Sequence, residues 1–252
     1  MILLVALRKE ILEQARSYRL LIVSLVFLLF GLTSPLLAKL APEFIKMLPQ
    51  GEEMARLIPA PTVADAVGQY VKNISQFAVL LAVLMGMGAV AQEKDKGTAA
   101  LMLSKPLPRW AFLLAKFGAL SATFLAGTAL AAIGGYYYTA VLFQAPDIVG
   151  WLALNGLLLL LTLVYVAVTL LCSTASRSMV VAGGLAFGAL LLLVMLSSLP
   201  VVGDYTPSAL LGWGSLLVTG TGRAAWGALW MSLGLIAASL LASWVVFERQ
   251  EL

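Results

Sequence analysis

The sequence contains no histidine and only one cysteine, Cys172. A single cysteine cannot form an intrachain disulfide, and a zinc site built from His and Cys side chains needs more ligands than one. Catalysis by Ser/His/Asp or Cys/His also requires a histidine. We therefore expect no catalytic residues, no cofactor-binding residues and no metal site in this chain.

Charged residues are also scarce, at 11% of the chain against 62% hydrophobic residues. A soluble domain carries about a quarter charged residues. Three long stretches contain no charged residue at all, between Lys116 and Asp147, between Arg177 and Asp204, and between Arg223 and Glu248. A helix needs about 20 mostly apolar residues to cross a hydrocarbon core, whereas barrel strands would show alternating segments of about ten. The sequence predicts an all-α polytopic membrane protein.

Six apolar stretches are long enough to cross the membrane, and we expect them to form one transmembrane domain over residues 1–252. They are residues 20–38, 74–91, 111–136, 151–172, 179–199 and 224–247. Thr62 and Asp65 match a capping box, which predicts that the helix of the second span begins near Val63, outside the membrane. A short helix is expected over residues 208–218, before the last span. Trp151, Trp213, Trp226 and Trp244 are expected at membrane interfaces.

Residues 1–18 predict an amphipathic helix. Apolar residues recur there at spacings of three and four, at Leu4, Leu7, Ile11, Ala15 and Tyr18, while Lys9, Glu13 and Arg16 lie on the other face. A basic amphipathic helix before a membrane span lies in the interface plane. A signal peptide is the weaker alternative, because the apolar run begins only after Arg19 and is long for such a segment.

Positive charge is distributed unequally between the two sides that six spans define. The side that holds both termini carries 11 of the 16 Lys and Arg residues: Arg8, Lys9, Arg16, Arg19, Lys94, Lys96, Lys105, Arg109, Lys116, Arg177 and Arg249. The opposite side carries Lys39, Lys46, Arg56, Lys72 and Arg223. Loops rich in Lys and Arg stay in the cytoplasm. We expect a multi-pass protein of the cell membrane with both termini cytoplasmic.

Residues 92–116, between the second and third spans, form the densest charge cluster of the chain. Gly97 and Thr98 favour a break, residues 99–104 can form a short helix, and Pro106 and Pro108 favour an extended exit. A short helix held parallel to the membrane would offer its charges, and an apolar knob, to a soluble partner. The spacing alone is equally compatible with an ordinary solvated loop.

The order of residues in this loop resembles the cytoplasmic loop of ABC-2 type transporter permeases. The likeness rests on Glu93, Gly97-Thr98, Leu103-Ser104, Pro106, Arg109 and Lys116. It extends in outline over the whole chain, from the amphipathic N-terminal helix to the half-apolar segment before the last span. The proline at position 108 departs from many relatives and would stiffen the exit from the loop.

The resemblance implies the membrane subunit of an ABC exporter, or of a related mechanotransmitter. The loop would be a coupling helix that docks in an ATP-binding subunit, flanked by the N-terminal helix, and the segment before the last span would form short outer re-entrant helices. The residues assigned to ATPase docking are Glu93, Lys94, Asp95, Lys96, Gly97, Thr98, Leu101, Met102, Leu103, Pro106, Arg109 and Lys116.

The nucleotide-binding motif G-x-x-x-x-G-K-[ST] is absent from the chain. ATP and Mg²⁺ are therefore expected in two copies of a partner ATPase subunit, with a second permease copy beside this one. Membrane lipid is a further expected partner, the outer side leaves room for an accessory extracytoplasmic protein, and nucleic acid is not expected. The alternative is a non-transporting scaffold or a membrane-embedded enzyme whose loop docks a different soluble partner.

Polar residues within the predicted spans are candidates for lining a pathway. They are Gln76, Asn155, Thr162 and Tyr165. The alternative is that these side chains hydrogen-bond between helices or to their own backbone. No ionisable residue is centred in a span, which argues against a proton- or sodium-driven carrier. The low polarity favours a lipid, an amphipathic drug or a peptide over a sugar as substrate.

Overall fold

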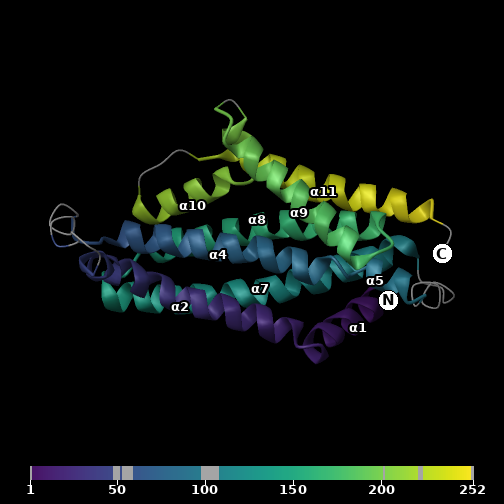
Figure 1. Cartoon of the computed structure of the whole chain (residues 1–252), viewed down its shortest axis with the longest axis horizontal. Coiled ribbons are helices and arrows are strands. Elements are labelled where there is room, and N and C mark those ends of the chain that lie inside the picture. The colour runs from purple at the N-terminus through teal and green to yellow at the C-terminus, as the bar shows by residue number, and fades with distance from the viewer. Residues whose placement is uncertain are drawn as a thin grey trace.

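The computed structural model describes residues 2–47, 52, 59–97, 108–200, 202–220 and 224–250, and within these ranges it contains helices and no strands (Figure 1). Six segments are long and apolar enough to cross a membrane. They are α2 (Arg19–Lys46), α4 (Val63–Gly86) with the short α5 (Ala91–Asp95), α7 (Arg109–Leu142), α8 (Ile148–Ala175), α9 (Met179–Ser197) and α11 (Trp226–Glu248). The predicted all-α fold with six spanning helices is confirmed.

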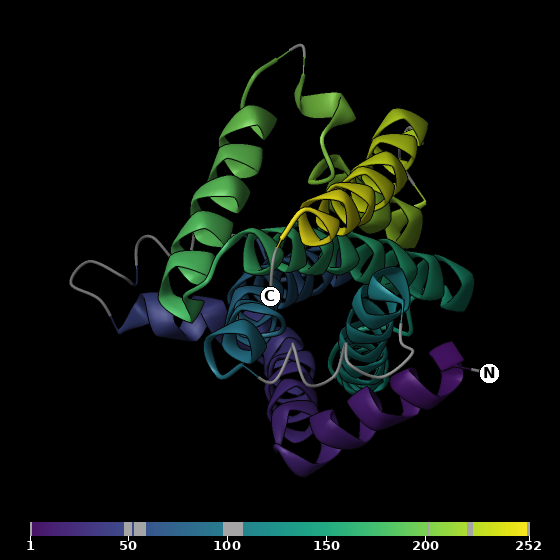
Figure 2. The ribbon, with the colours of Figure 1, turned by 90° about the vertical axis from the view of Figure 1, so that its right-hand side faces the viewer.

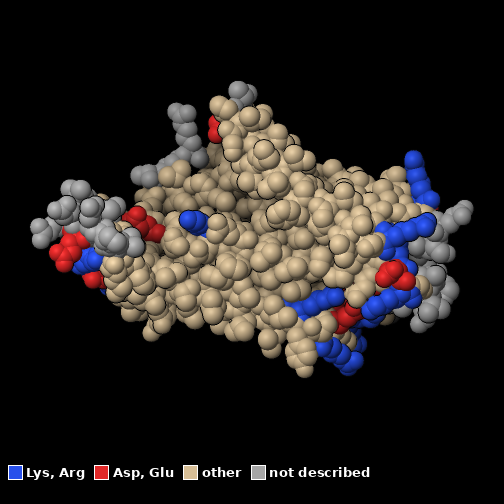
Figure 3. Space-filling view, viewed as in Figure 1, with Lys and Arg blue, Asp and Glu red and all other residues tan. Residues whose placement is uncertain are grey.

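Both chain ends lie at one end of the helix bundle, which we call the termini end, and the opposite end is the far end (Figures 1 and 2). Helix α1 (Ile2–Arg16) packs at the termini end against α7. The short helices η1 (Gly203–Tyr205) and α10 (Ala209–Thr219) lie between α9 and α11 in the chain. On the face shown in Figure 3, most Lys and Arg atoms gather at the termini end, and a broad uncharged surface separates them from the far end.

Helix α8 is the centre of the bundle. It packs against α4, α7, α9, α10 and α11. Figure 2 shows α9 (green) and α11 (yellow) leaning apart on the same side of α8. Trp151, at the start of α8, is only 1% exposed and its indole Nε1 donates a hydrogen bond to Ala132 O at 3.0 Å. Trp151 therefore faces the interior of the bundle and is not part of a lipid-facing aromatic belt, because the interior supplies the partner that its N–H needs.

Helix α2 continues past the predicted end of the first span at residue 38 and runs through Pro35 and Pro42 to Lys46. Its long contact with α7 supports this extension. At Gly31 the two backbones are so close that an added Cβ would lie 2.6 Å from Ala131 O. Farther along, Lys39 Nζ donates to Leu142 O at 2.7 Å, and a cation is favourable at the C-terminal end of α7. Tertiary contacts thus outweigh the helix-breaking tendency of proline.

The capping box at the start of α4 is present as the sequence predicts. The Thr62 backbone N–H donates to Asp65 Oδ2 at 2.8 Å, and the Thr62 hydroxyl donates to the same oxygen at 2.7 Å. These two bonds satisfy polar groups at the start of the helix and fix its first residue at Val63.

Candidate functional site

The second apolar segment is interrupted at the termini end. Helix α4 ends at Gly86, residues 87–90 form turns, and α5 begins at Ala91. The sequence predicts one uninterrupted span over residues 74–91. The break leaves backbone groups without helical partners, and such groups must be satisfied when they are buried.

Ser173 satisfies the backbone at this break. It lies in the last part of α8 and is fully buried. Its hydroxyl oxygen accepts from the N–H groups of Val90 and Ala91, both at 3.0 Å, and donates to Met87 O at 2.8 Å. We call this set of three bonds the Ser173 staple. One side chain of α8 therefore fixes the position at which α5 leaves the bundle.

A group of ion pairs joins α1, α5 and α7, and we call it the ion cluster: Lys9, Glu10, Glu13, Glu93 and Lys116. Lys116 Nζ lies 3.2 Å from Glu10 Oε2 and 2.6 Å from Glu93 Oε1. The side chains of Lys116 and Glu10 are 4% and 7% exposed. Lys9 Nζ lies 3.1 Å from Glu10 Oε1 and 3.6 Å from Glu13 Oε2. Three segments distant in sequence are thus connected through one buried ammonium group.

The charge on Lys9 is favoured by these neighbours. Partial burial lowers the pKa of Lys9, but the charge and hydrogen bond of Glu10, with the charges of Glu93 and Glu13, outweigh burial and raise the pKa above its ordinary value. Lys9 therefore remains protonated at neutral pH and supplies positive charge to the cluster.

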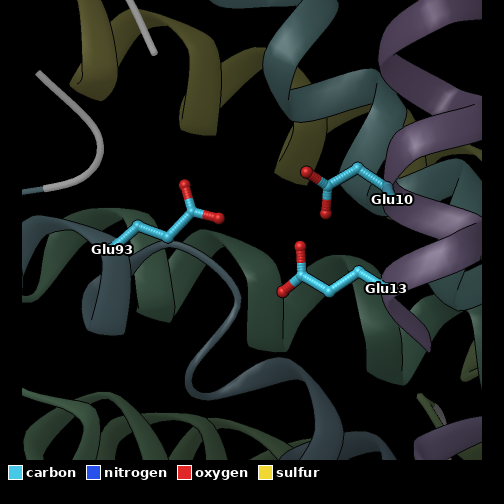
Figure 4. Close-up of side chains that lie close together, drawn as sticks. All are labelled: Glu10, Glu13 and Glu93. Carbon is cyan, nitrogen blue, oxygen red and sulfur yellow. The ribbon is translucent and has the colours of Figure 1, made fainter. Parts of the chain in front are cut away.

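Three carboxylates of the cluster face a common space, which is an arrangement that could bind a metal ion (Figure 4). One oxygen each of Glu10, Glu13 and Glu93 lies within 4.8 Å of the others. A cavity of about 30 Å³ beside them is lined also by Gln14 and Arg19. However, Lys9 and Lys116 already bind these carboxylates, and a divalent cation would be placed against their ammonium groups. The arrangement fits an ion-pair network rather than a metal centre.

Basic side chains also bind the C-terminal ends of α8 and α11. Arg109 Nη1 donates to Phe247 O, to Glu248 O at 2.9 Å and to Gln250 O at 3.1 Å. Lys94 Nζ donates to Thr174 O at 2.6 Å and to Gln250 Oε1 at 3.1 Å. Cations stabilise helix C-termini because the carbonyl groups there carry partial negative charge. These bonds hold the end of α11 and α8 against α5 and the start of α7.

The predicted docking residues fall into three groups in the structure. Lys116, Glu93, Lys94 and Arg109 bind other parts of this chain, as described above. Asp95, Lys96 and Gly97 are exposed, and Gly97 has a φ of +68°, which favours glycine. The remaining residues lie outside the described part of the chain: Thr98, Leu101, Met102, Leu103 and Pro106. ATPase docking itself stays a prediction.

Three of the predicted pathway residues are buried on α8, and the fourth is exposed on α4. Asn155 is buried, accepts from Tyr70 Oη at 2.6 Å and donates to Trp151 O at 2.9 Å. Thr162 is buried and donates to Leu158 O at 2.8 Å, and Tyr165 is 5% exposed. Gln76, in contrast, is exposed on α4. The first two side chains have the hydrogen bonds that their burial requires, as the alternative interpretation proposes.

Sequence reasoning missed Glu10, Ser173 and Gln250. The predicted apolar face of the first helix does not include Glu10, although Leu3, Leu7, Glu10 and Gln14 also share a face by helical spacing. Leu4 and Tyr18, on the apolar face that the sequence predicts, are 68% and 67% exposed. The predicted fourth span ends at residue 172, which puts Ser173 in a connecting loop, whereas α8 continues to Ala175. The helical spacing of Leu3 and Gln14 was the available signal for Glu10.

The fold and this end of the bundle define a polytopic α-helical membrane protein with no nucleotide-binding motif of its own. A family model described as ABC-2 family transporter protein matches residues 4–252. The chain belongs to the ABC-2 transporter family. It is similar to the "Uncharacterized transmembrane protein YxlG" of Bacillus subtilis (strain 168), at 30% identity over 197 residues, which cover 74% of this chain and 73% of that protein. Membership supports a permease subunit of an ABC transporter, generally a non-catalytic subunit, and implies an ABC ATPase subunit as partner.

Proposed function

We propose that this chain is the permease of an ABC exporter and that an ATPase subunit docks at the termini end, on the cytoplasmic side. The observation that carries the proposal is the interrupted second segment. Helix α5 leaves the bundle at the Ser173 staple and leads directly to the exposed residues Asp95, Lys96 and Gly97. A push on these exposed residues would be transmitted to α4, α7 and α8.

In this proposal the docking surface begins at Asp95, Lys96 and Gly97 and continues through the predicted residues Thr98, Leu101, Met102, Leu103 and Pro106. Lys94, Arg109 and Lys116 act behind the surface, because their side chains bind other helices of the chain. Two permease copies and two ATPase copies would form the transporter, and ATP with Mg²⁺ would be bound in the ATPase subunits.

The exposed polar stripe of α4 supports a pathway along this helix. Asp65, Lys72 and Gln76 are exposed, and Gln69 and Ser75 are half-buried on the same side. Asp65 and Lys72 precede the predicted span, whereas Gln76 lies within it, where an exposed amide is costly against lipid tails. The stripe is therefore proposed to face water or a second permease copy, with Gln76 as its deepest member.

Charge reversal on the docking surface tests the proposal. Lys96→Glu and Asp95→Lys should each reduce co-purification of the ABC ATPase subunit and its stimulated ATP hydrolysis in nanodiscs by about tenfold, the effect of roughly 1.4 kcal/mol in an equilibrium. Lys46→Glu reverses a charge on an exposed residue at the far end and is the matched control. Unchanged ATPase binding and stimulation in both docking variants would refute the proposed surface.

Sidedness can be tested separately with single cysteines in a Cys172→Ser background. A membrane-impermeant maleimide should label Lys46→Cys in intact cells and Asp95→Cys only after permeabilisation. Both positions are on described, exposed residues at opposite ends of the bundle. The reverse labelling pattern would place the termini end outside the cell and would contradict docking of a cytoplasmic ATPase.

A further inference from the structure

Lys116 lies where three segments of the chain meet at the termini end. Its ammonium group contacts Glu10 of α1 at 3.2 Å and Glu93 of α5 at 2.6 Å, while its own backbone belongs to α7. The residue separation is 106 for the first pair and 23 for the second. The ammonium group that binds α1 to α7 thus also binds α5.

The inward face of α1 has an unexpected composition. Glu10 and Gln14 are its buried residues, at 5% exposure each, whereas Leu4, Val5, Ile11 and Leu12 are between 38% and 69% exposed. A buried ion pair is often no more stabilising than an apolar replacement of similar size. Leucine at both inward positions would hold α1 to α7 by simple packing, so stability alone does not account for the charges.

Charged contacts differ from apolar packing in their response to a small displacement. If α5 moves away from α7, Lys116 loses its closest partner, Glu93, and a buried ammonium group with one carboxylate fewer is costly. The same holds for Glu10 if α1 moves. Displacement of one helix therefore raises the free energy of the whole cluster until the others follow.

We infer that Lys116 is a positioning residue that makes α1 and α5 move together when the ATPase subunit engages the loop. This inference rests on the proposed function. Helix α5 leads into the docking surface, and α1 carries the exposed basic residues Arg8 and Arg16 at the same end of the bundle. The ion cluster then makes the N-terminal helix respond to events at the loop.

The test compares wild type with Glu10→Gln, which removes only the α1 side of the cluster and keeps the Lys116–Glu93 pair. The matched control is Glu13→Gln, on the exposed neighbour whose carboxylate lies 3.6 Å from Lys9. Hydrogen exchange is measured on the full-length permease in nanodiscs. Backbone amides of residues 2–16 should exchange at least about tenfold faster in Glu10→Gln than in wild type or Glu13→Gln, while α8 is unchanged.

A second measurement uses the permease–ATPase complex with and without ADP–vanadate. In wild type and Lys116→Arg, exchange in residues 2–16 and 91–95 should change together on trapping. In a triple variant with Glu10→Gln, Glu93→Gln and Lys116→Met, which leaves no buried charge at these three positions, only residues 91–95 should respond. Lys116→Arg separates this role from a simple need for a well-folded protein, because it keeps the charge.

Two outcomes overturn the inference. Unchanged exchange in residues 2–16 of Glu10→Gln shows that the pair does not hold α1, and an undiminished response of residues 2–16 in the triple variant shows that another contact couples the helices. A wild-type permease that fails to bind any ABC ATPase subunit refutes the proposed function instead, and the measurement on the isolated permease still decides whether Glu10 holds α1.

Discussion

Two buried polar groups in this bundle use different chemistry. Toward the far end, Tyr70, Asn155 and Trp151 join α4, α8 and α7 by neutral hydrogen bonds, and their side chains are packed together, with the Tyr70 and Trp151 rings 4.9 Å apart. At the termini end, Lys116 and its partners join α1, α5 and α7 by charges. Both groups are buried, but only the second contains ions.

The difference follows from the surroundings. Ions are far more costly than amides or hydroxyls within the hydrocarbon region, so neutral hydrogen bonds are suited to fixing helices there. Charges are tolerated near the helix ends, and their contacts lose more energy when a partner is displaced. The neutral group is therefore suited to a rigid scaffold, and the ion cluster to a region where segments move as a unit.

The largest expected effect is on the ion cluster. Lys116→Met leaves the carboxylates of Glu10 and Glu93 buried without their shared ammonium group and should destabilise the protein by about 3–5 kcal/mol. Thermal unfolding of the detergent-purified protein measures the loss, with Lys96→Met at an exposed lysine as control. Equal stabilities of the two variants would show that the buried Lys116 contributes no more to stability than an exposed lysine.

A variant of Ser173 tests whether the loss of hydrogen bonds at the termini end destabilises the protein as much as the loss of a charge. Ser173→Ala leaves the N–H groups of Val90 and Ala91 without their acceptor, and one unsatisfied buried group costs about 1–3 kcal/mol. Hydrogen exchange should become faster at residues 87–95. Exposed Ser178→Ala is the control, and unaltered protection at Val90 and Ala91 would contradict the role of the staple.

A smaller effect is expected in the neutral group. Tyr70→Phe removes the hydroxyl that donates to Asn155 and should cost about 1 kcal/mol, since hydrogen bonds between membrane helices contribute modestly. Chemical unfolding in mixed micelles measures it, with the 62%-exposed Tyr137→Phe as control. A loss larger than that of Lys116→Met would reverse the proposed ranking of the two regions.

The smallest effect is expected from Arg109→Lys. Lysine keeps the charge at the end of α11 but lacks the planar guanidinium group with its several donors. It should therefore bind fewer of the carbonyl groups of residues 247–250. The expected cost is under about 1 kcal/mol. Faster hydrogen exchange confined to the end of α11 would be the signature, and Arg8→Lys, at an exposed position on α1, is the control.

Part of the candidate site could be predicted from the sequence, and part could not. The cluster of charges over residues 92–116 is visible because it interrupts long apolar stretches, and Thr62 with Asp65 marks the start of α4. The sequence does not reveal the break after Gly86, because the residues on both sides of it are apolar enough to continue a span. Its partner, Ser173, is 83 residues from Val90, and no local pattern connects the two.

The sequence by itself determined the six spanning helices, because an apolar segment of about 20 residues can satisfy its backbone in lipid only as a helix or in a closed barrel. Only the tertiary structure decided that Lys116, Lys94 and Arg109 turn toward other helices while Asp95 and Lys96 face outward. The physical reason is that the direction of a charged side chain depends on which partners the packing of distant helices brings within reach. The composition of the segment does not distinguish a side chain that turns inward from one that faces outward.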